Sequence, residues 1–117
     1  MNEDNLIVSK SKEFALRIVK LYKFLCDDRK EFVMSKQVLR SGTSIGANIK
    51  EAIRGQSKAD FYSKLNIALK EASETEYWLE ILHESDYINL KMFESIYCDC
   101  QELIKLLVSI TKTQKGD

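Results

Sequence analysis

The stretch of sequence that decides the fold runs from Leu39 to Asp60 and reads LRSGTSIGANIKEAIRGQSKAD. Small residues fill most of positions 41–47, where the apolar spacing predicts a helix interior, and each glycine there costs about 1 kcal/mol relative to alanine. The close approach of a neighbouring helix would offset that cost. Gly55 then ends this helix, and Ser57 with Asp60 forms a capping box that begins the next one. The stretch therefore predicts two helices joined by a short turn.

Outward from this stretch, the apolar spacing predicts helices over about residues 9–25, 31–54, 58–84 and 90–113. In each segment apolar residues recur every three or four positions, which is the spacing that gives a helix one buried face. The connections are short, so consecutive helices are expected to be antiparallel. The predicted fold class is all-α, an antiparallel up-down-up-down four-helix bundle that residues 1–117 form as a single domain.

The composition agrees with this prediction. The 117 residues include no proline and only four glycines, so few positions break a helix. No apolar run approaches the roughly 18 to 20 residues that cross a membrane. The acidic N-terminus lacks the apolar region of a signal peptide. We therefore expect a cytoplasmic protein with no membrane partner.

The sequence carries no P-loop, no GxGxxG motif and no Ser-His-Asp ordering. Its single histidine, His83, forms one Glu-x-x-His pair with Glu80, whereas di-iron bundles need such a pair on each of two helices. Cys98 and Cys100 would lie about 200° apart on a helix, and with Cys26 they are best interpreted as free thiols. We expect no enzyme activity, no metal and no cofactor; a metal site shared between subunits is the alternative.

Three polar residues lie beside the predicted apolar seams: Asn48, Glu51 and Glu76. We interpret them as a structural hydrogen-bond network that holds the helices in register. A ligand-binding or catalytic role is the alternative.

A narrow basic stripe follows one face of the second predicted helix. Its members are Lys36, Arg40, Lys50 and Arg54, and Lys58 and Lys64 extend it. The net charge is zero, but residues 36–64 hold six basic and two acidic side chains, whereas residues 65–102 hold two basic and nine acidic ones. The stripe is either a face that is solvated or paired with acidic neighbours, or a patch that binds phosphate backbones. Because no aromatic residues interleave it, base-specific readout is not expected.

A second apolar stripe lies off the main seams of the third and fourth predicted helices. Its members are Ile67, Trp78, Ile81, Met92, Leu106 and Ile110. Scattered exposed apolar residues are common on monomers. A contiguous stripe that carries tryptophan more often marks a contact surface, so we predict an oligomer interface with Trp78 near its centre.

Four short motifs carry a family resemblance: SIGANIKEA at 44–52, KADF at 58–61, IAL at 67–69 and ETEY at 74–77. In this order they resemble the motifs of the bacterial four-helix bundle proteins named 23S rRNA-intervening sequence proteins. The resemblance covers nearly the whole chain and is most specific in the second and third helices. Here Gly46 stands where that family often has proline.

The resemblance implies a bundle that assembles as a homo-oligomer, typically a ring-like pentamer. It also points to a relative, the accessory variability protein of diversity-generating retroelements, which is basic and works with a reverse transcriptase and RNA. Two functions are therefore expected. The first is a non-enzymatic, homo-oligomeric interaction or scaffold module, and the alternative is an RNA- or nucleoprotein-binding accessory factor that uses the basic stripe.

Overall fold

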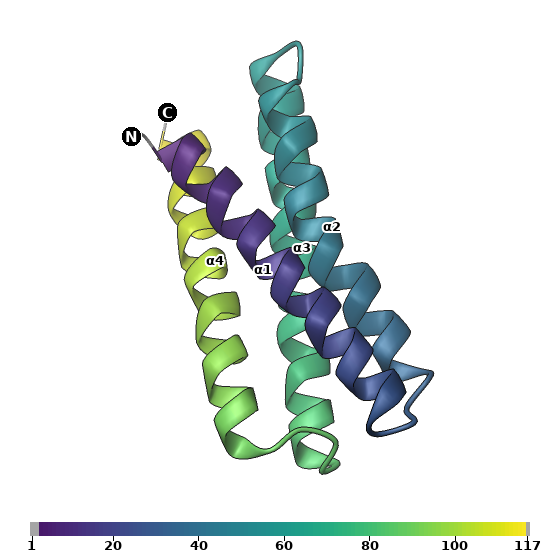
Figure 1. Cartoon of the computed structure of the whole chain (residues 1–117). Helices are drawn as coiled ribbons and strands as arrows, with labels where there is room; N and C mark the ends of the chain where they lie inside the picture. Colours follow the sequence, from purple (N-terminus) through teal and green to yellow (C-terminus); the bar gives the residue numbers. More distant parts are fainter. Residues whose placement is uncertain (1–2, 117) are drawn as a thin grey trace.

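The computed structural model describes residues 3–116, which form four helices (Figure 1). They are α1 (Glu3–Asp27), α2 (Met34–Ile53), α3 (Lys58–Glu84) and α4 (Leu90–Gly116). Each helix runs opposite to the one before it, and α1 and α3 each contact both α2 and α4. The predicted all-α four-helix bundle is confirmed.

Apolar side chains from all four helices fill one core. Its largest fully buried members are Ile7, Phe14, Ile18, Leu25, Val38, Ile45, Ile49, Leu65, Leu79, Leu82, Leu103 and Leu107. Their spacing follows the helical period of each segment, so each helix turns one face inward. No helix within residues 3–116 is both long and apolar enough to span a membrane.

The first helix begins earlier than the residue 9 expected from the sequence, at Glu3. The added turns are held by Ile7, which lies seven residues before Phe14; the two side chains are 1% and 2% exposed. Ser11 is also buried, and its hydroxyl donates to the Val8 carbonyl at 3.1 Å. The apolar seam of α1 therefore extends two turns towards the N-terminus.

The second helix begins later than expected, at Met34, because Glu31 acts as its cap. One carboxylate oxygen of Glu31 accepts from the backbone N–H groups of Val33 and Met34 at 3.2 and 3.1 Å. The other oxygen accepts from the Ser35 N–H at 2.7 Å. The first N–H groups of a helix have no partner inside it, and a negative charge there complements the helix dipole. Glu31 thus ends the turn before α2 and is itself nearly buried.

Gly42 and Gly46 of α2 both face α1, but the two glycines differ. A Cβ atom added at Gly42 would lie 2.7 Å from Cγ1 of Ile18, a buried side chain of α1. A Cβ added at Gly46 would lie 3.4 Å from the nearest atoms, both in Ser11. Only Gly42 is therefore required by the close approach of the two helices.

The buried thiol of α4 makes stability depend on alkaline pH. Burial, reinforced by the negative charge of Glu76, raises the pKa of Cys100 from an ordinary value near 9 to about 12. The thiol stays neutral in the fold but ionises in the unfolded chain, so its contribution is complete below pH 9 and is lost as the pH rises towards 12. We expect about 1 kcal/mol to be lost between pH 8 and pH 10.

Urea unfolding across this pH range, in reducing buffer, would measure the loss. Cys100→Ala should reduce the alkaline slope. It should not remove the slope, because Tyr97, whose hydroxyl donates to Glu80 at 2.5 Å, also has a raised pKa. Equal slopes in the two proteins would show that Cys100 is not the responsible group.

Candidate interaction surfaces

A groove of about 500 Å³ lies between α1 and α2, on the side of α2 that carries its small residues. The residues that characterise this basic groove are Lys12, Ala15, Gly46, Lys50, Ile53 and Arg54. Gly46 is one of the lining residues, and because it has no side chain it leaves space in the groove. The three cations are exposed, and the described residues that line the groove include no carboxylate. The basic groove is thus positively charged and has an apolar wall at Ile53, which is 46% exposed.

Two members of the predicted basic stripe form ion pairs with acidic side chains. Arg40 forms ion pairs with Glu71, at 3.1 Å, and with Glu74 of α3. The bond to Glu74 raises the pKa of Arg40, and the same bond holds the pKa of the Glu74 carboxyl low. Lys64 lies 3.3 Å from Glu51. Arg40 and Lys64 therefore match the interpretation of a face paired with acidic neighbours.

The remaining stripe residues are exposed. Lys50 and Arg54 line both the basic groove and a second hollow of about 500 Å³ towards α3. That second hollow also contains the carboxylates of Glu51 and Asp60, so its charge is mixed. The other two, Lys36 and Lys58, are exposed near the beginnings of α2 and α3. The structure adds Lys12 of α1, which sequence analysis missed because it lies on another helix.

The three polar residues predicted as a network are not joined in the way expected. The Asn48 amide donates to the Ser44 carbonyl of its own helix at 2.8 Å, and Glu51 is exposed. Glu76 is half-buried near α4. Burial raises the pKa of Cys100, and the hydrogen bond to Glu80 raises the pKa of Tyr97; the negative charge of Glu76 adds to both shifts.

The buried polar contact between α2 and α3 is instead the hydrogen bond between the hydroxyls of Ser41 and Thr75, at 2.9 Å. Both side chains are fully buried. The signal in the sequence was a polar residue on an apolar seam, since Thr75 lies three residues after Ala72 and four before Leu79. The Thr75 hydroxyl also lies 2.7 Å from the Glu71 carbonyl of its own helix. Separating the pair would leave the buried Ser41 hydroxyl without this partner, so the contact favours one register of the two helices.

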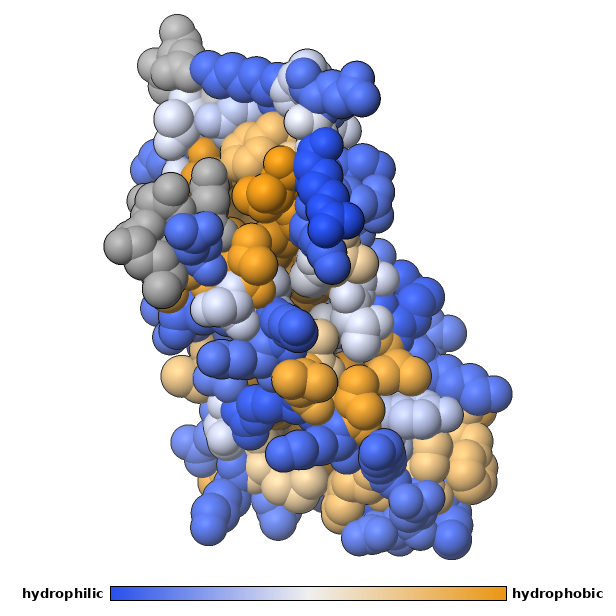
Figure 2. Space-filling model, turned by 45° about the horizontal axis from the view of Figure 1, so that its top comes forward, coloured by the Kyte–Doolittle hydropathy of each residue, from blue (hydrophilic) through white to orange (hydrophobic). Residues whose placement is uncertain are grey.

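The outward side of α3 carries an apolar surface, here called the aromatic ridge: Ile67, Tyr77, Trp78 and Ile81. Tyr77 is 55% exposed and Ile67 is 38% exposed. The rings of Tyr77 and Trp78 meet edge to face at a centroid distance of 5.5 Å. Trp78 is half-buried, packs against the core and donates from its indole N–H to Glu74 at 3.2 Å. Figure 2 shows that apolar side chains on the displayed face gather in patches between hydrophilic ones.

The predicted contribution of α4 to an interface needs correction. Ile110 is only 8% exposed and belongs to the core, because it lies seven residues after Leu103 and three after Leu107 on the inward face. Met92 and Leu106 are half-buried and pack against the core. Tyr77, which the prediction omitted, is the more exposed candidate on α3.

The Glu-x-x-His pair of α3 has structural partners. Glu80 accepts the hydrogen bond from the Tyr97 hydroxyl. The imidazole of His83 stacks on Phe93 at a centroid distance of 4.5 Å, and its Nδ1 lies 3.3 Å from the Ile88 carbonyl. Among the described residues, no group of three or more histidine, cysteine, aspartate or glutamate side chains is placed to hold a metal ion.

Comparisons with known proteins add a family and a fold. The family model of the 23S rRNA-intervening sequence protein matches residues 3–109. The chain is also similar to a crystal structure at 1.70 Å resolution of a protein with unknown function from the S23 ribosomal protein family of Bacteroides thetaiotaomicron. The two are 64% identical with a TM-score of 0.94, and the match covers 95% of this chain and 99% of that chain. No protein of curated function matches the chain.

Proposed function

The chain belongs to the 23S rRNA-intervening sequence protein family, and from this premise we propose that it is a non-catalytic, homo-oligomeric interaction module. The observation that carries the proposal is the aromatic ridge. Tyr77 and Ile67 lie open on a bundle whose core is already closed by its own side chains. Aromatic anchors of this kind supply much of the binding energy at protein interfaces.

The distribution of charge supports contacts between unlike faces of two subunits. The basic groove lies on α1 and α2, whereas residues 65–102, in α3 and α4, hold nine acidic and two basic side chains. A contact between unlike faces repeats from one subunit to the next and closes into a ring when the rotation permits. The ring-like pentamer implied by the family resemblance is an assembly of this type.

Sedimentation tests the proposal directly. At micromolar concentration the mass measured by sedimentation should be well above the 13.6 kDa of one chain. The double variant Ile67→Asp and Tyr77→Asp should keep its helical content and sediment as a monomer, because charges would be buried in the interface. Leu16→Asp, at a position on α1 that is 58% exposed, is the matched control and should leave the assembly intact. A wild-type monomer at this concentration would refute the proposal.

The second candidate function is the binding of RNA or another polyanion in the basic groove. Lys12, Lys50 and Arg54 line this groove, and the described lining includes no carboxylate. The family resemblance also points to a relative that works with RNA, the accessory variability protein, which is consistent with this function. Repetition of the groove around an oligomer would multiply a weak contact. Such binding should be tolerant of sequence and steeply dependent on salt, because counterion release drives it.

Titration of a structured RNA at about 50 mM salt tests this candidate. The variant Lys50→Glu with Arg54→Glu should weaken binding at least tenfold and flatten its salt dependence. The control variant, Lys105→Glu with Lys112→Glu, makes the same change in net charge at exposed positions of α4. Absence of binding by an intact oligomer, or equal losses in both variants, would exclude a site in the groove.

A further inference from the structure

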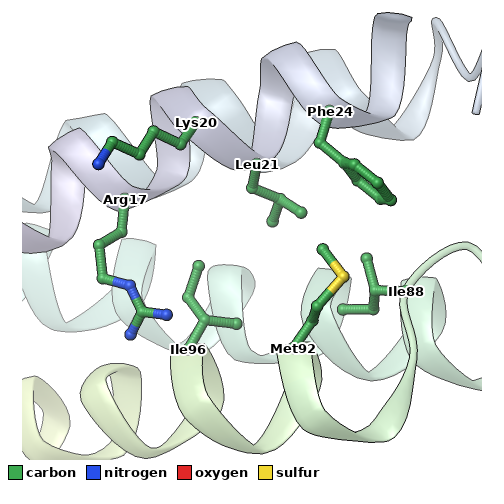
Figure 3. Close-up of a pocket in the computed structure, with 7 residues that line it drawn as sticks. All are labelled: Arg17, Lys20, Leu21, Phe24, Ile88, Met92 and Ile96. Carbon is green, nitrogen blue, oxygen red and sulfur yellow. The ribbon is translucent and has the colours of Figure 1, made fainter. Parts of the chain in front are cut away.

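A separate pocket of about 220 Å³ lies between α1 and α4, here called the seam pocket. Figure 3 shows Leu21 and Phe24 of α1 pointing across it towards Met92 and Ile96 of α4, with Ile88 at one end. Most of the surface of Leu21, Ile88 and Ile96 is buried in the core, so each presents only a small part of its surface to the pocket. Its wall is thus mainly apolar.

The position of the seam pocket follows from how α1 and α4 meet. The pair α1 and α4 is the least extensively packed of the neighbouring helix pairs. An ion pair from Arg17 to Asp99 joins the two helices at the edge of the pocket, and a second one, from Lys10 to Glu102, joins them further along. Long charged side chains bridge a wider gap than interlocking apolar ones, so the space beside them is left open.

Two cations, Arg17 and Lys20, lie at the other end of the seam pocket. In Figure 3 the Arg17 guanidinium turns towards α4, whereas the Lys20 side chain runs along α1, away from the apolar lining. The Arg17 guanidinium is already engaged: it donates to Asp99 at 2.6 Å, to the Ser95 carbonyl at 3.2 Å and to the Ser95 hydroxyl at 2.9 Å. Lys20 is exposed and has no ion-pair partner among residues 5–113, whose side chains the structure describes. No carboxylate belongs to the described lining. Lys20 therefore supplies a positive charge without an ion-pair partner on α1, beside the apolar pocket.

We propose that the seam pocket binds a small anionic amphiphile, with its apolar tail between α1 and α4 and its carboxylate at the Lys20 ammonium group. An engineered cavity of about 150 Å³ holds benzene, so a pocket of about 220 Å³ has room for a chain of about six to eight carbons. The unbranched side chain of Met92 adapts readily to the shape of such a tail. The proposal is independent of self-association and of RNA binding, since neither the aromatic ridge nor the basic groove lines this pocket.

Methionine methyl signals in NMR provide a selective test. In the full-length protein labelled at methionine methyl groups, octanoate should shift the Met92 signal saturably and leave that of Met34, on α2, unchanged. Across the series butanoate, hexanoate and octanoate, each added methylene should tighten binding by up to about fourfold. The proposal is overturned if millimolar octanoate leaves Met92 unmoved or shifts both signals together.

A second test of the proposal varies the charge of the ligand. Octylamine has the same tail and the opposite head, so it should bind at least several-fold more weakly than octanoate. Lys20→Glu should weaken octanoate about tenfold and strengthen octylamine. Lys23→Glu makes the same change in charge at an exposed position on the same helix and should change neither. Equal effects of the two variants, or equal binding of the two probes, would refute a carboxylate site at Lys20.

Discussion

Replacement of Gly42 by leucine should destabilise the bundle by about 3 kcal/mol, at the upper end of the range for overpacked cores. Even a single added carbon at this position would lie 2.7 Å from Ile18 Cγ1 and 2.9 Å from its Cγ2. Ile18 is fully buried and branched at Cβ, so it has no free rotamer into which it can move. The two helices would have to separate, and the core contacts of α1 with α2 would be lost. The shift in the urea midpoint at fixed protein concentration measures the effect.

Replacing each of the two glycines by alanine should change the stability of the protein in opposite directions. Gly42→Ala should destabilise despite its better helix propensity, whereas Gly46→Ala should stabilise by up to about 1 kcal/mol. The difference arises because the added Cβ at Gly46 would make contacts no closer than 3.4 Å, with Ser11. If both alanine variants were stabilised alike, the contact of α1 with Gly42 would be looser than the structure indicates.

Replacement of Glu31 by alanine should destabilise the protein by about 2 to 3 kcal/mol. Loss of an ordinary N-cap costs about 0.5 to 2 kcal/mol for one or two bonds, and Glu31 accepts three backbone bonds with a charged group. Val33, at the N-cap position, makes no side-chain cap bond, so no neighbour replaces the carboxylate. Thermal and urea unfolding measure the loss, and the start of α2 should fray in amide hydrogen exchange.

Two further variants separate capping from charge. Glu31→Gln keeps an acceptor oxygen of similar position and should lose only part of the stability. Asp28→Ala removes an exposed acidic residue just before the cap and should change stability by less than about 0.5 kcal/mol. A Glu31→Ala protein as stable as the Asp28→Ala protein would contradict the capping role.

The elements of the fold depend on signals that lie within a few residues of one another. The Ser57 hydroxyl accepts from the Asp60 N–H at 3.0 Å and begins α3, as the capping motif predicts. The start of α2 was placed too early because a glutamate that reaches forward over three N–H groups leaves no standard motif. The start of α1 was placed too late because a buried serine interrupts its apolar seam. Both errors concern helix ends, where local signals are weakest.

The candidate surfaces depend on contacts that cross between helices. Sequence periodicity placed Arg40 on an exposed face, but only the packing of α2 against α3 brought Glu71 and Glu74 to it, more than thirty residues away. In the same way Lys12 joined Lys50 and Arg54 because α1 crosses α2 beside Gly46. Helical spacing states which residues share a face, but it does not state which faces meet.

By itself the sequence determined the all-α class, the order of the helices and most of the core, because helical periodicity and capping act over one or two turns. Only the tertiary structure decided that Ile110 is buried, that Ser41 and Thr75 form the polar contact of the core, and where the basic groove and the seam pocket lie. These features depend on the distance and crossing of helices that are remote in the chain. Such distances are set by the summed packing of many side chains, which no single stretch of sequence contains.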